Sequence, residues 1–95
     1  MAAYIIYQAD VLDEAAYELY KAQAAPSVVA AGGRYLVRGG EVEVLEGQLL
    51  ASRTVILEFP DKTTLLEWYH GAYAEIRKLR ATCANAILYV IDGVA

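Results

Sequence analysis

The chain opens with an apolar stretch that predicts a β-strand. Residues 2–12 (AAYIIYQADVL) are rich in Tyr, Ile and Val, and apolar side chains occupy both alternating sets at the start of the stretch, which indicates a central strand. Asp13 then precedes an acidic, helix-favouring segment, so we expect a helix that begins at Asp13 and ends at Gly32 and Gly33. Pro26 lacks an amide hydrogen and predicts a kink or a restart within this helix.

The middle of the chain predicts three short strands. Residues 33–38 form an alternating run, and Gly39 and Gly40 after it permit the positive φ values of a tight hairpin. Residues 41–46 (EVEVLE) are therefore expected to return as the second strand of that hairpin. Residues 52–60 (SRTVILEFP) are β-branched and aromatic up to a proline, which predicts a further strand.

The last third of the chain predicts a broken helix and a final strand. Asp61 caps residues 62–70 (KTTLLEWYH), Gly71 interrupts the helix, and helical composition then resumes as far as Thr82 with basic residues near its end. Residues 85–94 (NAILYVIDGV) are almost continuously apolar, which is the pattern of an interior strand covered on both faces.

The order β-α-β-(β)-β-α-β predicts an α+β fold. We expect a ferredoxin-like split βαβ sandwich, in which an antiparallel sheet carries two helices on one face. A length of 95 residues predicts one domain over residues 1–95. Alternation along the strands assigns the two faces of the sheet. The expected helix-facing set is Ile5, Tyr7, Ala9, Val11, Val37, Val55, Leu57 and Phe59. The expected outer set is Tyr4, Ile6, Gln8, Asp10, Arg34, Leu36, Arg38, Thr54, Ile56 and Glu58.

The outer set predicts a second buried surface. It is too apolar for open water and too charged for a featureless core. The hydrophobic fraction of 58% also exceeds the roughly 45–50% that is usual for globular chains. Contact with a second subunit would bury the Ile and Leu side chains and leave the charged groups paired or wet at the rim. We therefore expect a homodimer that forms through the sheet faces.

Charge and motif content exclude several function classes. A net charge of -4 and a pI of about 4.8 argue against nucleic acid and anionic membranes as partners. No signal-peptide core is found, and no apolar run approaches the ~18 residues of a membrane span, so we expect a cytoplasmic protein. The lone Cys83 predicts a buried thiol, and the lack of zinc spacing, phosphate loop and dinucleotide fingerprint predicts neither metal nor cofactor.

Two arginines in GGRYLVRGG (residues 32–40) are candidate ligand-binding residues. In a regular strand Arg34 and Arg38 share one face, and together they would clamp a carboxylate, enolate or phosphate. The alternative is pairing within the chain. Across a two-residue turn Arg38 would lie opposite Glu41, and Glu58 has the same parity on a nearby strand. Beside a guanidinium Glu58 would be a weak base, so we expect it to orient Arg38.

Aromatic residues supply a second candidate site. Tyr17 and Tyr20 form one stripe at helical spacing, and a second stripe contains Trp68, Tyr69 and Tyr73. Such stripes usually belong to a core. Buried tyrosine hydroxyls nevertheless need partners, and their convergence near a helix break would line a pocket for a flat aromatic or quinone-like ligand.

His70, the only histidine, has two interpretations. It would serve as a general base or an axial haem ligand if it faced a pocket. A histidine just before Gly71 is more often a solvated helix end, where its charge suits the helix dipole.

Several ordered segments resemble the domain-of-unknown-function family DUF1330 over nearly the whole chain. They are GGRYLVRGG, VEVLEG, VILEFPD and WYHGAY, followed by Leu79 and Arg80. The family belongs to the dimeric α+β barrel superfamily, so the resemblance implies ferredoxin-like protomers that join sheet to sheet. The superfamily includes small monooxygenases, haem-handling proteins, muconolactone isomerase-like enzymes and regulatory ligand-binding modules, commonly with a site between sheet and helices. Residues 70–73 (HGAY) depart from the frequent Ser-Pro-x-Tyr and are one residue shorter.

Three functions remain open at this point. The first is a homodimer that binds a small aromatic or anionic metabolite, with Arg34 and Arg38 as anchors and the tyrosines as an apolar wall. The second is a cofactor-independent enzyme, monooxygenase-like or isomerase-like, in which a tyrosine or His70 transfers a proton. The third is a structural or interaction dimer whose arginines are consumed by the carboxylates of Glu41, Glu43 and Glu58.

Overall fold

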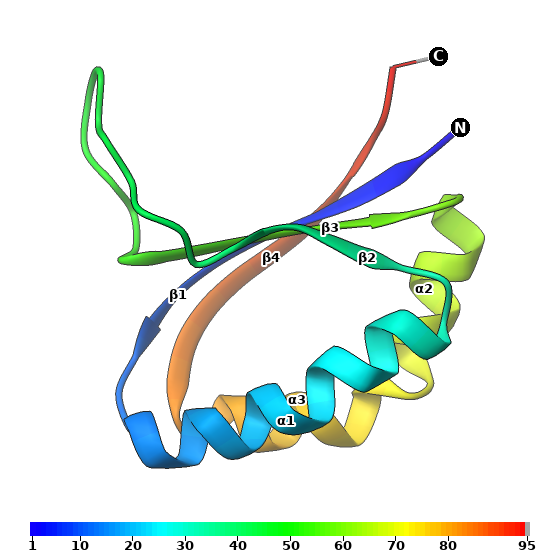
Figure 1. Ribbon diagram of the computed structural model, residues 1–95, viewed down its shortest axis with the longest axis horizontal. Helices are drawn as coiled ribbons and strands as arrows, with labels where there is room; N and C mark the ends of the chain where they lie inside the picture. The colour runs from blue at the N-terminus through cyan, green and yellow to red at the C-terminus, as the bar shows by residue number, and fades with distance from the viewer. Residues whose placement is uncertain (95) are drawn as a thin grey trace.

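One antiparallel sheet forms the base of the fold. The computed structural model describes residues 1–94 (Figure 1). Its strands are β1 (Ala3–Val11), β2 (Arg34–Arg38), β3 (Arg53–Phe59) and β4 (Ala84–Asp92). They lie in the spatial order β2-β3-β1-β4, with every neighbouring pair antiparallel. The prediction that the first strand is central is confirmed.

Three helices cover one face of this sheet. They are α1 (Glu14–Ala30), α2 (Lys62–His70) and α3 (Tyr73–Ala81), and all lie on the same side in Figure 1. This element order and strand order make the ferredoxin-like split βαβ arrangement, so the predicted α+β fold class is confirmed. None of the helices formed by residues 1–94 is long and apolar enough to cross a membrane.

Aspartate side chains cap the two helices that follow strands, as expected. The Asp13 carboxylate accepts a hydrogen bond from the Ala16 backbone N–H at 3.1 Å. The Asp61 carboxylate accepts one from the Thr64 N–H at 2.7 Å. Each bond satisfies a backbone donor that the first helical turn leaves free.

The two predicted helix interruptions have different outcomes. Gly71 separates α2 from α3 as expected: its N–H bonds the Glu67 carbonyl at 2.9 Å, and a Cβ there would lie 2.6 Å from that oxygen. Pro26 does not restart α1, which is one continuous helix. Ala24 and Val28, on either side of the proline, are both buried. Packing against the sheet therefore outweighs the lost backbone hydrogen bond.

The strand expected at residues 41–46 does not form, so that prediction was wrong. β2 pairs directly with β3, and residues 39–52 make an arm that projects from the sheet face opposite the helices (Figure 1). Residues 41–50 are all exposed. β3 buries Val55, Leu57 and Phe59 beside β2, whereas glutamates alternate through 41–46, so apolar burial favours β3 as the partner.

The final strand lies at an edge of the sheet, which corrects the prediction of an interior strand. Its neighbour is β1 alone. The side chains on its outer face, Ile87, Tyr89 and Ile91, are 52%, 49% and 52% exposed. The continuous apolar run therefore belongs to a strand with one face open in the single chain.

The helix-facing set is largely confirmed and forms the core with the helices. Buried members of that set are Ile5, Tyr7, Ala9, Val55, Leu57 and Phe59, and Val11 is half-buried. Cys83 is fully buried, as predicted. Its thiol lies 3.4 Å from the Arg80 carbonyl oxygen.

A β-bulge in β2 overturns part of the face assignment. Tyr35 lies opposite Leu57, but the register then shifts, so that Val37 lies opposite Ile56. Directly opposed residues share a face, and the extra residue of a bulge redirects the side chains that follow it. Val37 therefore faces outward with Ile56, and its assignment to the helix-facing set was wrong.

The same bulge separates the two candidate arginines. Arg34 lies opposite Glu58 on the outer face, whereas Arg38 lies opposite Val55 on the helix-facing side. The prediction that Arg34 and Arg38 share a face was therefore wrong. The predicted pairing of Arg38 with Glu41 was wrong as well, because the hairpin that required it does not form.

Close packing at Gly33 generates a stability prediction. A Cβ on Gly33 would lie 2.7 Å from Cζ of the fully buried Phe59 ring. Overpacking of this kind costs about 1–3 kcal/mol, so we expect Gly33→Ala to lower the free energy of unfolding by that amount in urea denaturation. The matched control is Gly40→Ala, whose Cβ would meet nothing within 4 Å. Equal losses in the two variants would contradict the packing argument.

Candidate functional site

Side chains from the sheet and from each helix line a narrow cavity, which we call the tyrosine cavity. A volume of ≈ 30 Å³ inside it is wide enough to admit the centre of a water molecule, and its full outline of ≈ 440 Å³ includes space open to solvent. It is therefore narrow, and it is better matched to a flat group than to a bulky one. Its walls hold five tyrosines, one tryptophan and three cationic side chains, and aliphatic residues complete them.

Four of the tyrosines form two hydrogen-bonded pairs. The hydroxyls of Tyr7 and Tyr17 lie 3.0 Å apart, and those of Tyr20 and Tyr73 lie 2.6 Å apart. Arg80 Nη1 donates to the Tyr73 hydroxyl at 3.2 Å from behind the cavity wall. The buried phenols therefore satisfy one another, which is the condition for keeping them in a core.

The aromatic rings contact one another in tilted, edge-to-face and stacked pairs. Tyr17 and Tyr20, on α1, have ring centroids 5.2 Å apart. Trp68, on α2, stacks on Tyr73, on α3, at 4.4 Å. The structure thus brings together four of the five aromatic residues that the sequence singled out. The shortened HGAY segment holds Tyr73 in the core, where it is 1% exposed.

Two arginines bring positive charge to the tyrosine cavity. The Arg38 guanidinium lies 4.6 Å from the ring centroid of Tyr35, and that of Arg53 lies 5.5 Å from the ring centroid of Tyr17. Gly39 leaves room for this arrangement. Its φ is 68°, and a Cβ there would overlap the Arg53 guanidinium. The positive φ favours glycine at the base of the arm, and a side chain there would displace the Arg53 guanidinium.

Among residues 1–94, no carboxylate lines the tyrosine cavity. The ion pairs among residues 1–94 are Lys21–Glu18, Arg34–Glu58, Lys62–Asp92 and Lys78–Glu75, so neither Arg38 nor Arg53 has a carboxylate partner there. Lys21, the third cation in the wall, is paired with Glu18 at 2.8 Å. Arg53 Nε and Arg80 Nε are buried without a hydrogen-bond partner in the described chain. Buried donors of this kind call for an acceptor, from water or from a ligand.

Burial raises the pKa of the tyrosines in the cavity. It is the main cause for Tyr7, Tyr20, Tyr35 and Tyr73, and the pKa of each lies above the ordinary value of 10.0. These phenols are therefore protonated at neutral pH. They act as hydrogen-bond donors rather than as bases.

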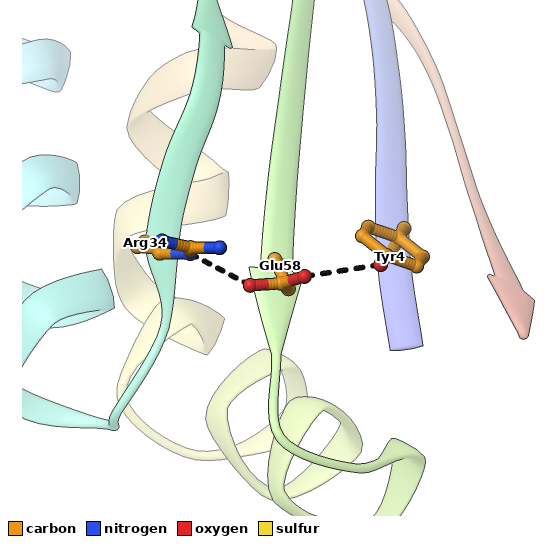
Figure 2. Close-up of polar contacts among 3 residues, drawn as sticks. All are labelled: Tyr4, Arg34 and Glu58. Atoms are coloured by element: carbon orange, nitrogen blue, oxygen red, sulfur yellow. Dashed lines mark hydrogen bonds and ion pairs between the residues drawn. The ribbon is translucent and has the colours of Figure 1, made fainter. Parts of the chain in front are cut away.

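Two predicted site residues, Arg34 and Glu58, lie on the opposite face of the sheet. Figure 2 shows them in a row with Tyr4 across three neighbouring strands. Arg34 Nε donates to Glu58 Oε1 at 2.6 Å, and the Tyr4 hydroxyl donates to Glu58 Oε2 at 3.0 Å. Glu58 therefore orients Arg34, and the expectation that it orients Arg38 was wrong.

Tyr69 and His70 lie beside a second and wider cavity between α2 and β4, in which ≈ 310 Å³ admits the centre of a water molecule, against ≈ 30 Å³ in the tyrosine cavity. Arg77 Nη1 donates to the Tyr69 hydroxyl at 2.9 Å, and the Tyr69 and His70 rings meet edge to face at 5.2 Å. His70 is exposed at the last residue of α2, as expected for a solvated helix end. Neither residue lines the tyrosine cavity.

Several residues of the tyrosine cavity were not singled out in the sequence. Alternation would have found Arg53, which has the parity of Val55 and so faces the helices. Helical spacing would have found Lys21, one turn after Tyr17. Arg80 lies two helical turns after Tyr73 on α3, so the same spacing would have placed it beside Tyr73, although it lies outside the cavity lining.

Comparison with models of known families identifies the family of this chain. The model described as "Domain of unknown function (DUF1330)" matches residues 2–94. The protein belongs to this family. The resemblance seen in the sequence is thereby confirmed. A comparison of this DUF1330 chain with curated proteins finds no match.

Solved structures similar to this DUF1330 chain support the fold. RPA0582, a protein of unknown function from Rhodopseudomonas palustris, has a TM-score of 0.77 at 17% identity, covering 99% of this chain and 83% of its own. Methylated RPA0582 has a TM-score of 0.78 at 16% identity, with 99% of this chain and 82% of its own chain covered. SnoaB, a cofactor-independent oxygenase from Streptomyces nogalater, has a TM-score of 0.66 at 8% identity, with 99% of this chain and 94% of its own chain covered. At these identities the likeness is one of fold.

The row of Arg34, Glu58 and Tyr4 on the outer face of the sheet predicts how the stability of the protein depends on pH. Hydrogen bonds from Arg34 and Tyr4 hold the pKa of Glu58 below its ordinary 4.5. A lowered folded-state pKa stabilises the fold above pH 4.5, and this contribution is lost as the pH falls below that value. We expect Glu58→Gln to reduce the melting temperature near neutral pH and to lose less on acidification to about pH 3 than the unmodified protein.

The control is Glu43→Gln, a change on the exposed arm. It should keep the pH dependence of the unmodified protein. Parallel melting curves for Glu58→Gln and the unmodified protein across the acidic range would argue against the Glu58 assignment.

Proposed function

We propose that this protein is a cytoplasmic binding protein that takes a small anionic ligand into the tyrosine cavity, between the sheet and the helices. One observation carries the proposal: Arg38 and Arg53 line a cavity that no carboxylate lines, and neither has an ion-pair partner among residues 1–94. Guanidinium groups match planar anions, and although Arg38 is exposed, Arg53 Nε is buried without a hydrogen-bond partner among residues 1–94. A bound anion would supply the missing acceptor.

The walls favour a flat ligand. Aromatic rings of Tyr17, Tyr20, Trp68 and Tyr73 surround a space too narrow for a bulky group. Aromatic walls with a few convergent polar groups are the usual composition of a small-molecule site. The anchor differs from the one expected from sequence, since Arg53 replaces Arg34 beside Arg38.

The contacts weigh against a purely structural role for the cavity arginines. Glu58 is already occupied by Arg34 and Tyr4. Glu41 and Glu43 lie on the exposed arm and form no ion pair with Arg38. The carboxylates that would have consumed the arginines are therefore engaged elsewhere or remote.

The cavity also favours binding over proton-transfer catalysis. Its lining holds no Asp, Glu or His, and the raised pKa of Tyr7, Tyr20 and Tyr73 keeps those phenols protonated. No side chain of the lining is therefore suited to accept a proton at neutral pH. An enzyme of the monooxygenase or isomerase kind is the second candidate, and it would need a base that these walls do not hold.

A thermal-shift series tests the binding proposal. We expect benzoate, a flat carboxylate, to raise the melting temperature with concentration and to do so more than acetate or phosphate at equal ionic strength. Arg38→Gln and Arg53→Gln should each weaken the response by about tenfold in apparent affinity, as loss of one charge-assisted hydrogen bond predicts.

Arg77→Gln is the matched control, because Arg77 donates to Tyr69 outside the cavity. Ligand-free melting temperatures of all variants separate lost binding from lost stability. An undiminished benzoate response in Arg53→Gln would exclude the cavity as the site.

We further propose that two copies associate through the outer sheet faces. Ile87, Tyr89 and Ile91 are each about half exposed there, beside Ile6 and Ile56 of the neighbouring strands. A contiguous apolar face of this kind is typical of an interaction surface. In a two-fold contact the same patch serves both subunits.

Light scattering tests the association. We expect the molar mass of a dimer for the unmodified protein and a shift toward the monomer for Ile91→Lys, because symmetry would bring two new like charges together. Leu19→Lys, an equally drastic change at an exposed position of α1, should leave the mass unchanged. A monomeric unmodified protein at micromolar concentration would refute the dimer.

A further inference from the structure

The hydroxyl groups of the tyrosine cavity have more hydrogens than partners. Each of the pairs Tyr7–Tyr17 and Tyr20–Tyr73 has two hydroxyl hydrogens, and one of them is used in the bond between the two oxygens. Whichever oxygen donates, one hydrogen per pair remains. All four hydroxyl-bearing side chains line the cavity, and no side chain among residues 1–94 accepts the remaining hydrogen of either pair.

Nitrogen donors add to this excess. Arg80 Nη1 already donates to Tyr73, which occupies a lone pair of that oxygen. Arg53 Nε is buried without a partner in residues 1–94. The acceptors left among the side chains of the wall are phenol oxygens, which carry no charge at neutral pH because burial raises the pKa of Tyr7, Tyr20 and Tyr73. The cavity is thus rich in donors and poor in acceptors.

The charged and titratable groups of residues 1–94 that line this space include no carboxylate, although burial itself disfavours a charge there. They are Tyr7 on β1, Tyr17, Tyr20 and Lys21 on α1, Tyr35 and Arg38 on β2, Arg53 on β3, and Tyr73 on α3. Trp68 on α2 and Leu88 on β4 add no charge. A ligand oxygen there meets guanidinium groups and hydroxyl hydrogens, which favour its anionic form over its neutral form.

The shape of the donor set indicates one oxygen on a flat ring. The donors are separate single groups: hydroxyls of the tyrosine pairs and an Nε edge. The Arg38 guanidinium lies over the Tyr35 ring, which leaves it as a source of positive charge beside the space. Single donors along the wall of one cavity suit an oxyanion, and the aromatic walls suit the ring that carries it.

We propose that the tyrosine cavity binds a flat phenol or enol as its oxyanion. On binding, the O–H bond of the ligand breaks, the electron pair stays on the ligand oxygen, and the proton passes to the solvent buffer. This inference rests on the proposed binding function and specifies the chemical class of the ligand. It requires no oxidant, reductant or cofactor.

4-Nitrophenol is a direct probe, because its phenolate absorbs at longer wavelength than the phenol. We expect its ionisation midpoint in the presence of saturating protein to fall by about one pH unit or more, which equals about tenfold tighter binding of the anion than of the phenol. 4-Nitroanisole, which has no hydroxyl proton, should bind weakly or not at all.

Two variants test the donors separately. The double variant Tyr7→Phe/Tyr17→Phe removes both hydroxyls of one pair, and replacement of both partners by apolar groups of the same shape is nearly neutral for stability. Arg53→Gln removes charge. Each should shrink the midpoint shift at least severalfold, whereas Tyr89→Phe, on the outer face, should leave it unchanged.

The outcomes separate this inference from the binding function. If 4-nitrobenzoate or benzoate binds while 4-nitrophenol binds without a change in its midpoint, or as the neutral phenol, the phenolate inference is overturned and anion binding stands. If none of these anions binds, both proposals fall. A shift that survives in the double variant would also overturn the role assigned to the hydroxyls.

Discussion

A single extra residue in β2 is the constraint on which the site depends. Strand geometry places residues four apart on the same face, so Arg34 and Arg38 would both point outward in a regular strand. The register shift between Tyr35 and Val37 reverses the alternation after it. Arg38 therefore enters the tyrosine cavity, and Arg34 alone meets Glu58 on the outer face. Without the bulge, the cavity would lose a cation and the outer face would hold two guanidinium groups for one carboxylate.

The charges in the cavity are held by aromatic contacts rather than by ion pairs. Arg38 and Arg53 lie over tyrosine rings, which attract cations through the ring face without neutralising them. Gly39 completes the arrangement, because its conformation lets the arm depart and its missing side chain leaves space for Arg53. The hydrogen-bonded tyrosine pairs then provide neutral polar walls. The positive charge and the donors remain available to a bound anion for these reasons.

The two sheet faces separate two kinds of chemistry. On the outer face the polar groups are already satisfied, since Arg34 and Tyr4 both donate to Glu58 (Figure 2). Paired charges cost less to cover than unpaired ones, so that row is compatible with contact between subunits. On the helix-facing side the arginines are unpaired and the tyrosines keep spare hydrogens. That face is suited to a ligand.

Local patterns in the sequence determined most of the fold and the aromatic half of the candidate site. Alternation predicted β1, β2 and β3, the caps Asp13 and Asp61 predicted two helix starts, and helical spacing brought out Tyr17, Tyr20, Trp68 and Tyr73. These features depend on neighbouring residues, so the sequence alone contains them. The tertiary structure decided the partner of β2, the edge position of β4, the projecting arm and the face of Arg38, because each depends on which strands pair and in what register. The cationic half of the site, Arg38 with Arg53, could therefore be recognised only once β3 lay beside β2.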